Sequence, residues 1–437
     1  MKSIAQIAAR LQGYDPQSLT TERVSAFLNE LVAPVTETEQ VALFDALGRV
    51  LAEDIVSPVS VPPHDNSAMD GFAFNGAQLQ PDLPLRLQVV GTAFAGKAWQ
   101  GTVGIGKCVK IMTGAVMPAG LDTVVPLEFA RVQGDAVSIP ANVLKCGDNR
   151  RHLGEDLMAG HTALAQGERL GPAALGLLAS LGLGQVQVYR RIRVAYFSTG
   201  DEILSAGEAP REGAVYDSNR YTVIGMLKQL GCEVVDLGVV RDEPALLEKA
   251  LLQATARADA VITSGGVSAG EADHTRTLMQ KLGDMAFWRV AMRPGRPMAV
   301  GHISAPAAGA QSSDGVIAPT SSALLFGLPG NPVAVMVTFI AFVRPALLRM
   351  MGASPKPQIM LRAVSESPIQ KKPGRTEYQR CIVTPRADGQ PTVRITGNQG
   401  SGVLSSMVQA NGLLVLEHEQ GPVAAGDEVN VLMLDDL

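Results

Sequence analysis

The chain has 437 residues, of which 46% are hydrophobic and 18% are charged. At roughly 150 residues per domain, this length corresponds to about three domains. The apolar content excludes disorder over most of the chain. The 37 basic and 42 acidic residues give a net charge of −5, and aromatic residues make up only 4%. These values exclude the strongly basic or aromatic surface with which proteins bind nucleic acid.

The four cysteines lie far apart and form no CxxC pair. The sequence therefore indicates neither a thiolate zinc site nor a disulfide framework, and it favours a reducing compartment. The longest apolar stretch, residues 333–343, is well short of the roughly 20 residues that a membrane span needs. Gln6 and Arg10 interrupt the first residues, where a signal peptide would have an apolar core. We expect a cytoplasmic protein that does not associate with a membrane.

The N-terminal part of the chain has a mixed pattern. A helical segment, about residues 3–50, precedes a β-rich region with many glycines and prolines, and helical periodicity returns at residues 171–182. This predicts a β-rich domain (61–145) inserted into an elongated helical domain (1–60 and 146–190). Within the β-rich region, GTVGIGKC at 101–108 has the spacing of a phosphate-binding loop. We reject it, because Cys108 replaces the hydroxyl that would hold Mg²⁺ and a strand follows where a helix is required.

From residue 191 to 351 short β-branched strands alternate with helices, which predicts a doubly wound, mostly parallel sheet in an α/β domain. The segment 304–322 is small and polar and is expected to be a flexible loop. After Gly352 short strands alternate with turns, which predicts a C-terminal β-barrel (352–437) and an α/β multidomain protein overall. The predicted strands of the α/β domain are 191–199, 232–240, 259–266, 286–292 and 323–328, and its predicted helices are 218–231, 244–258, 273–283 and 333–351.

Four of these strands end in loops that carry chemistry. Ligands of an open parallel sheet bind at the carboxyl ends of the strands, and these loops read GDE (200–202), RDE (241–243), GGVS (265–268) and PGNP (329–332). Three of them deliver carboxylates, counting those that follow GGVS, and the glycine turn offers free N–H groups to an anion. Each loop alone is an ordinary strand-to-helix turn. Together they predict a site for phosphate and a hard cation such as Mg²⁺.

The charges are segregated along the chain. Residues 199–273 hold 13 acidic and 6 basic side chains, whereas residues 289–380 hold 11 basic and 3 acidic ones. Two solvated surfaces would give this pattern, and so would one pocket shared by a metal and a multiply charged anion. The pocket hypothesis predicts that the two segments converge in space.

Six motifs, in this order and at this spacing, closely resemble the molybdopterin molybdenumtransferase family, the bacterial MoeA type related to the E domain of gephyrin. They are NSAMDGFA (66–73), IMTGA (111–115), STGDEI (198–203), SGGVSAGEADH (264–274), RPGRPMAVG (293–301) and LPGNPVA (328–334). The resemblance spans nearly the whole chain. It implies an elongated helical domain with an inserted β domain, a molybdopterin-binding α/β domain, a C-terminal β-barrel, and a homodimer whose site lies between subunits.

The resemblance also implies an activity: insertion of molybdate into adenylated molybdopterin with release of AMP, assisted by Mg²⁺. The protein partners that it implies are the molybdopterin adenylyltransferase and molybdoenzyme-maturation proteins. Two further functions stay open, namely a molybdopterin adenylyltransferase and a non-catalytic pterin-binding scaffold. The implied residues are Glu202, Asp242 and Asp273 for metal binding and catalysis; Asp70 and Thr113 for catalysis from the partner subunit; and Ser264, Gly265, Gly266, Ser268, Arg293, Arg296, Pro329, Asn331, Arg375 and Ser401 for binding pterin, phosphate or molybdate.

The chain departs from the family pattern at a few of these positions. Arg293 and Arg296 stand where lysine is common. The positive charge is retained, but it is carried by a planar guanidinium group instead of the compact ammonium group of lysine. Glu243 stands where a second aspartate is common, which leaves open whether Asp242 or Glu243 is the metal ligand.

Overall fold

The computed structural model describes residues 2–266, 273–306, 320–387 and 389–434, without the side chains of 273–275, 306 and 320. The chain forms two compact units. The larger unit comprises Met1–Glu39, Gly48–Val50 and Val188–Leu437, and the smaller unit comprises Gln40–Leu47 and Leu51–Gln187. The predicted boundaries of four domains stay a prediction.

The smaller unit is built mainly of β-structure, as predicted for its central part. Its six-stranded sheet has the order β7-β4-β6-β5-β9-β8. Strand β6 begins at Lys107, within the rejected phosphate-loop motif, and continues past it, so the strand expected there is confirmed. Short pairs β2 with β11 and β3 with β10 lie outside this sheet, and helix α3 (Pro172–Ser180) begins with proline, which suits the first helical turn. The strands are β2 (Ile55–Val56), β3 (Asn66–Ser67), β4 (Gly71–Phe74), β5 (Leu85–Ala93), β6 (Lys107–Ile111), β7 (Thr123–Pro126), β8 (Arg131–Gln133), β9 (Ala136–Ile139), β10 (Arg150–Arg151) and β11 (Thr162–Leu164).

A six-stranded α/β sheet organises the larger unit, in the order β16-β13-β17-β21-β20-β18. The first four strands are parallel, which confirms the predicted mostly parallel sheet. Ser264 at the end of β17 pairs with Ser198 on one side and Leu328 on the other. The carboxyl ends therefore lie at one edge, as the order of the loops predicted. The strands are β13 (Arg193–Thr199), β16 (Glu233–Val240), β17 (Ala260–Ser264), β18 (Gly283–Arg289), β20 (Pro297–Pro306) and β21 (Thr320–Leu328).

Strands β20 and β21 form an antiparallel hairpin in which Ser304 pairs with Ser322. The sequence did not predict β20, and it assigned residues 304–306 and 320–322 to a loop. The loop prediction was wrong for these residues. They are small and show no strand periodicity, and their place in the sheet comes from backbone pairing between the two strands. The remainder of that predicted loop, 307–319, lies outside the described residues.

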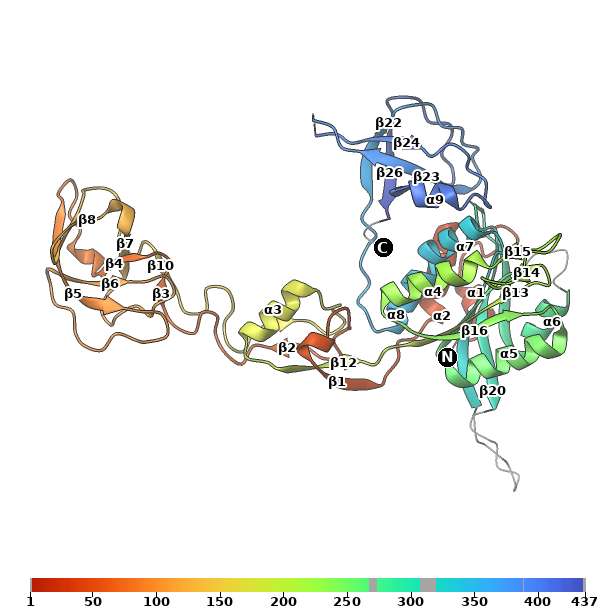
Figure 1. The fold of residues 1–437 in the computed structure, drawn as a ribbon, viewed down its shortest axis with the longest axis horizontal. Helices are drawn as coiled ribbons and strands as arrows, with labels where there is room; N and C mark the ends of the chain where they lie inside the picture. The colour runs from red at the N-terminus through yellow and green to blue at the C-terminus, as the bar shows by residue number, and fades with distance from the viewer. Residues whose placement is uncertain (1, 267–272, 307–319, 388, 435–437) are drawn as a thin grey trace, which may run out of the picture. The chain divides into compact units, whose positions relative to one another are not determined.

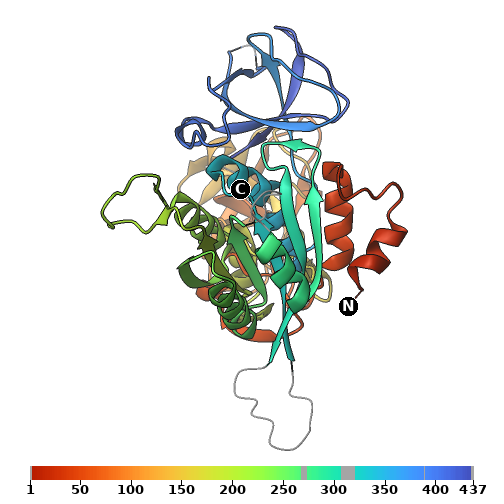
Figure 2. The same cartoon turned by 90° about the vertical axis from the view of Figure 1, so that its right-hand side faces the viewer.

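Helices cover both faces of the sheet. Alternate residues of β13 point to opposite faces. Val194 and Tyr196 belong to one hydrophobic cluster with residues of α1, α2, α4 and α7, whereas Ala195 and Phe197 belong to another with residues of α5 and α6. Figure 2 shows α1 and α2, in red, beside the sheet. The expected N-terminal helical segment ends earlier than predicted, since β1 (Thr38–Ala42) follows these two helices and pairs with β12 (Gln185–Tyr189). The helices are α1 (Ile4–Arg10), α2 (Thr21–Leu31), α4 (Ser218–Leu230), α5 (Pro244–Arg257) and α6 (Asp273–Leu282).

The apolar segment Pro332–Met350 is one continuous helix with a π turn. It consists of α7 (Pro332–Thr338), the π turn Phe339–Val343 and α8 (Arg344–Met350). Pro345 lacks the N–H that would continue the α pattern, which explains the turn just before it. Within the described residues this is the one helix long and apolar enough to cross a membrane, but 67% of it is buried inside the protein. Packing in the core accounts for its composition.

The C-terminal strands close into a five-stranded barrel, blue in Figure 1, as predicted. The short strand β19 (Met292–Arg293) adds to this barrel by parallel pairing with β23, so that Arg293 pairs with Glu377. The barrel is thereby joined to the loop between β18 and β20. Its elements are β22 (Leu361–Ser365), β23 (Thr376–Thr384), β24 (Thr392–Ile395), α9 (Ser405–Gln409), β25 (Gly412–Leu416) and β26 (Glu428–Met433).

Candidate active site

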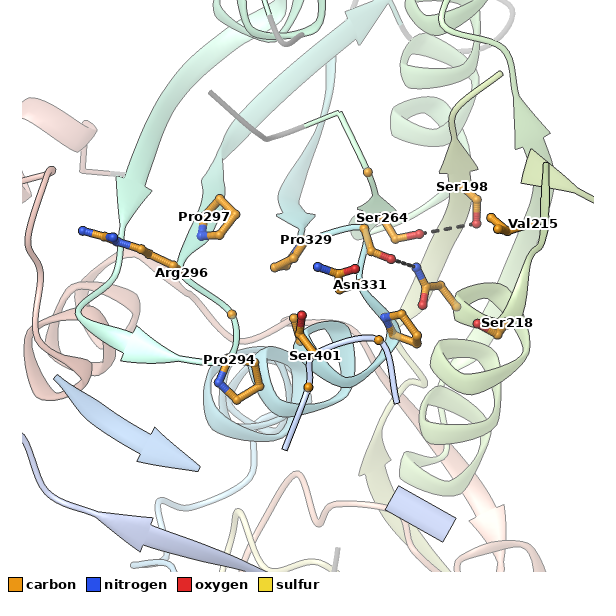
Figure 3. Close-up of a pocket in the computed structure, with 18 of the residues that line it drawn as sticks. Ser198, Val215, Ser218, Ser264, Pro294, Arg296, Pro297, Pro329, Asn331 and Ser401 are labelled. Carbon is orange, nitrogen blue, oxygen red and sulfur yellow. Dashed lines mark hydrogen bonds between the residues drawn. The ribbon is translucent and has the colours of Figure 1, made fainter. Parts of the chain in front are cut away.

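A cavity of about 1000 Å³ lies at the carboxyl edge of the parallel strands, within the larger unit. The acidic segment contributes Glu202 and Asp217 to its wall, and the basic segment contributes Arg293 and Arg375. The two segments therefore converge in space, as the pocket hypothesis predicted. Ten of the residues implied by the resemblance line this cavity, some of which are labelled in Figure 3: Glu202, Ser264, Gly265, Gly266, Arg293, Arg296, Pro329, Asn331, Arg375 and Ser401.

The turn after β17 requires glycine at its first position. Gly265 has a φ of +91°, and a Cβ atom there would lie 2.5 Å from the carbonyl oxygen of Thr199. Its N–H donates to the carbonyl of Leu328 at 3.1 Å. A larger residue would adopt an unfavourable backbone conformation and would clash with Thr199. The turn thus keeps the ends of three neighbouring strands close together beneath the cavity.

Three buried hydroxyl groups form a network at the floor of the cavity. Tyr196 Oη lies 2.9 Å from Ser198 Oγ and 2.7 Å from Ser264 Oγ, and Figure 3 shows the longer contact between the two serines, 3.4 Å. Burial raises the pKa of Tyr196 well above its usual range. The phenol therefore stays neutral and orients the two serine hydroxyls, which can donate to or accept from a ligand.

Two of the three carboxylates implied as metal ligands follow neighbouring strands. Glu202 lines the cavity, whereas Asp242 lies beside it and accepts a hydrogen bond from the hydroxyl of Thr199, itself a lining residue. In the described ranges no three histidine, cysteine, aspartate or glutamate residues gather as a metal site. Ser268 and the side chain of Asp273 lie outside the described residues.

Arginines from two elements form the opposite side of the cavity. Arg293 is exposed on β19, and Arg296 is also exposed and extends away from the other labelled residues in Figure 3. Arg375 Nε donates to Glu377 Oε1 at 2.8 Å. Because this buried glutamate holds the guanidinium in place, Arg375 presents a preoriented positive charge to an anion.

Ser401 reaches the cavity from a loop of the barrel. Its carbonyl accepts a hydrogen bond from Val333 N–H at 3.0 Å, at the first turn of α7. This bond joins the barrel loop to the α/β domain directly after the PGNP motif. Ser401 and Asn331, which are 70 residues apart in the sequence, consequently line the same cavity.

Arg380 on β23 supports that loop and was not predicted as a site residue. It is 1% exposed, and its guanidinium donates to the carbonyls of Asn398 (3.2 Å) and Gly400 (2.9 Å) and to Ser406 Oγ (3.0 Å). No carboxylate pairs with it among the described residues; burial, and then the charge of Arg293, lowers its pKa. In the sequence Arg380 is simply a charged residue within a predicted strand, so no local pattern indicates that it bonds to the Ser401 loop.

Asp217 and Asn219, at the start of α4, also line the cavity and were missed. The sequence predicted a helix that begins with the Ser/Asn pair at this place. The helix does start at Ser218, and Asp217 is its N-cap. Because polar residues are common at helix starts, the sequence here carries no separate signal for a ligand.

Asp70 and Thr113 lie together in the smaller unit. The N–H and the hydroxyl of Thr113 both donate to Asp70 Oδ1, each at 2.7 Å. The hydrogen bonds from Thr113 lower the pKa of the exposed carboxyl group. The NSAMDGFA and IMTGA motifs therefore build one local arrangement on β4 and β6.

Comparison with known proteins agrees with this architecture. Three family profiles match: the MoeA N-terminal region (domain I and II) over residues 19–182, the "Probable molybdopterin binding domain" over 195–349, and the MoeA C-terminal region (domain IV) over 362–434. The chain is 40% identical over 408 residues to the molybdopterin molybdenumtransferase of Haemophilus influenzae, covering 93% of this chain and 96% of that one.

Two further relatives support the same assignment. The molybdopterin molybdenumtransferase of Bacillus subtilis is 32% identical over 405 residues, covering 91% of this chain and 90% of that one. The crystal structure of the molybdopterin biosynthesis moeA protein from Pyrococcus horikoshii superposes with a TM-score of 0.78 at 26% identity, covering 95% of this chain and all of that one (100%).

Proposed function

Because the chain belongs to the molybdopterin molybdenumtransferase family, we propose that it transfers molybdenum from molybdate to the dithiolene of adenylated molybdopterin and releases AMP. It is thus a transferase of molybdenum cofactor biosynthesis. The single observation that carries the proposal is the cavity in which the acidic and the basic segment meet. A ligand that carries a metal, phosphates and a dianion at once needs both kinds of wall.

The side chains around the cavity divide the work. Arg293, Arg375 and the hydroxyl of Ser401 hold molybdate, because fixed cations and hydroxyl donors match its two negative charges. The N–H groups of the Gly265–Gly266 turn receive phosphate oxygens. Two Mo–S bonds then form while one oxo group leaves as water with the two thiol protons. Water breaks the pyrophosphate bond and AMP leaves.

Mg²⁺ fits the donor set of the acidic side. Glu202 and Asp242 provide hard carboxylate oxygens, and Mg²⁺ takes one or two carboxylates together with phosphate oxygens. When bound, the ion would neutralise charge on the phosphates. Asp242 is the better candidate than Glu243, since Thr199 orients the carboxylate of Asp242 whereas the side chain of Glu243 makes no capping bond at the start of α5. Asp273 would be the third ligand.

The proposal extends to assembly and location. The exposed pair Asp70–Thr113 would complete the site from the partner subunit of a homodimer, and Ser268 would contact phosphate or pterin. All four cysteines are free, which suits a cytoplasmic enzyme. The molybdopterin adenylyltransferase and molybdoenzyme-maturation proteins would be its protein partners.

The two other functions considered from the sequence are not favoured. The curated relatives named molybdopterin molybdenumtransferase match this chain over 91% or more of its length. An adenylyltransferase would consume ATP, and a scaffold would bind the cofactor without turnover.

Release of AMP from adenylated molybdopterin in the presence of molybdate and Mg²⁺ tests the function. Asp242→Asn should lower the rate by about a hundredfold, in line with loss of a positioned charged group, whereas the neighbouring Glu243→Gln should retain it. Wild-type protein that releases no AMP contradicts the function. An Asp242→Asn variant with full activity contradicts the metal site alone.

A further inference from the structure

The N-terminal end of α4 presents a buried carboxylate oxygen to which none of the described residues donates. Asp217 Oδ1 accepts from Arg220 N–H at 3.0 Å as the N-cap. Asp217 is only 5% exposed, yet its Oδ2 atom has no hydrogen-bond partner among the described residues. The guanidinium of Arg220 is not available, because it pairs with Asp236. A buried carboxylate oxygen without a donor is costly, so this atom is suited to a donor from outside the chain.

A second acceptor lies two residues further on. Asn219 Nδ2 donates to the carbonyl of Gly330 at 2.7 Å. Because a carbonyl can only accept, this bond fixes which way the amide is turned. Asn219 Oδ1 is buried and likewise has no partner among the described residues. Asp217 and Asn219 line the same cavity. A ligand there can therefore donate two hydrogen bonds, one to each of these acceptor atoms.

The cavity thus differs in character between its two sides. Figure 3 shows Ser198 and Ser218 on the α4 side, and Pro294 and Arg296 on the side of β19. The α4 side presents unpartnered acceptors, whereas Arg293 and Arg375 place positive charge on the other side. A ligand that satisfies both sides has neighbouring N–H donors at one end and negative charge at the other.

We propose that Asp217 and Asn219 bind the N–H edge of the pterin ring, and so set the direction in which the substrate lies. This inference rests on the proposed function, which supplies the pterin. A pterin carries an amino group at C2 next to the ring N3–H, two neighbouring donors that match the two acceptors. The pterin head lies at the start of α4, and the dithiolene that receives molybdate lies toward Arg293 and Arg375. Asp217 is thus a specificity-determining residue.

The test compares two neutral probes that differ at one group. In 6-hydroxymethylpterin C2 carries the amino donor, whereas in 6-hydroxymethyllumazine it carries a carbonyl. Both fluoresce, so their dissociation constants can be measured by titration with purified full-length protein. Wild-type protein should bind the pterin about tenfold or more tightly than the lumazine, the usual cost of leaving a charged hydrogen bond unmade.

Asp217→Asn is the decisive variant. Asparagine caps helices as well as aspartate does, so the fold should be kept and the melting temperature nearly unchanged. The amide would place a donor where Oδ2 accepts, and the preference for pterin should disappear, with molybdate binding unchanged within about twofold. The matched control is Glu233→Gln, which removes an exposed carboxylate of the same domain that does not line the cavity and should keep the preference.

Three results would overturn the inference: wild-type protein that binds neither probe, wild-type protein without a preference, and an Asp217→Asn variant that keeps it. None of them depends on turnover. Failure of the wild-type protein to release AMP would instead contradict the proposed function, so the two tests fail separately.

Discussion

The acidic and the basic side of the cavity are built in different ways. The carboxylates of Glu202 and Asp242 follow neighbouring parallel strands, and the hydroxyl of Thr199, at the same edge of the sheet, donates to Asp242. The arginines come from β19 and from the barrel, where Arg375 is oriented by Glu377 and Arg380 supports the Ser401 loop. The acidic side is therefore a product of sheet topology, whereas the basic side depends on docking of the barrel.

The largest expected effect comes from Arg380. Arg380→Met removes donors to two carbonyls and to Ser406 and should release the Ser401 loop, lowering kcat/KM for molybdate by about a hundredfold. Arg380→Lys keeps the charge but cannot bond all three acceptors, and should be intermediate. Steady-state AMP release measures both. The control is Arg394→Met, since Arg394 is exposed on β24 of the same barrel. An Arg380→Met variant as active as this control would show that the Ser401 loop keeps its position without the hydrogen bonds from Arg380.

A carboxylate at the other edge of the sheet should affect stability instead. Asp259, at the amino end of β17, accepts from Arg190 Nη1 and Nη2 at 2.7 and 2.8 Å. Burial alone would raise the pKa of Asp259, but the hydrogen bonds from Arg190 and Arg193 N–H outweigh it and the pKa is lowered. Asp259→Asn should cost about 2 kcal/mol of unfolding free energy at neutral pH and leave AMP release intact.

The pH dependence of that difference has a definite sign. A carboxyl group with a lowered folded-state pKa stabilises the fold above its ordinary pKa, and this stabilisation is lost as the pH falls through the lowered value. Urea unfolding of the wild type and Asp259→Asn should therefore differ at pH 5 to 7 and converge in acid. A difference that persists in strong acid would show that packing, and not charge, separates the two.

A smaller effect is expected at Arg375. Its guanidinium is about one third exposed, with 36% of the side chain accessible, so water competes for it. Arg375→Ala should raise the KM for molybdate about tenfold with little change in melting temperature. Titration with molybdate alone, without pterin, separates anion binding from turnover. Unchanged molybdate affinity would remove Arg375 from the basic side of the site.

The smallest effect concerns the exposed pair in the smaller unit. Thr113→Val removes the hydroxyl donor to Asp70 but keeps the N–H bond, and the pKa of Asp70 should rise part of the way to its ordinary value. Carbon NMR of the carboxyl group measures this shift. Thr113→Ser is the control, since it keeps the hydroxyl. Equal pKa values in all three proteins would leave the backbone bond as the sole cause.

Much of the α/β domain could be predicted because its signals are local. Short β-branched runs and capped helices placed β13, α4, β16, α5 and β17 within a few residues of the structure. Chain direction then put Glu202, Asp242 and the glycine turn at one edge. Strand β20 was missed because it depends on its pairing with β21, and the N-terminal helical segment was made too long because its later part pairs with distant residues.

By itself the sequence determined which groups could meet a ligand and on which edge of the sheet they would lie, because the order of parallel strands carries that information along the chain. Only the tertiary structure decided which side chains have partners. Within the described part of the chain Asp217 Oδ2 lacks a donor, because Arg220 pairs with Asp236. Arg380 supports the Ser401 loop because β24 and α9 return to β23. Hydrogen bonds between residues far apart in the chain produce no periodic pattern in the sequence, so they can be recognised only in the folded structure.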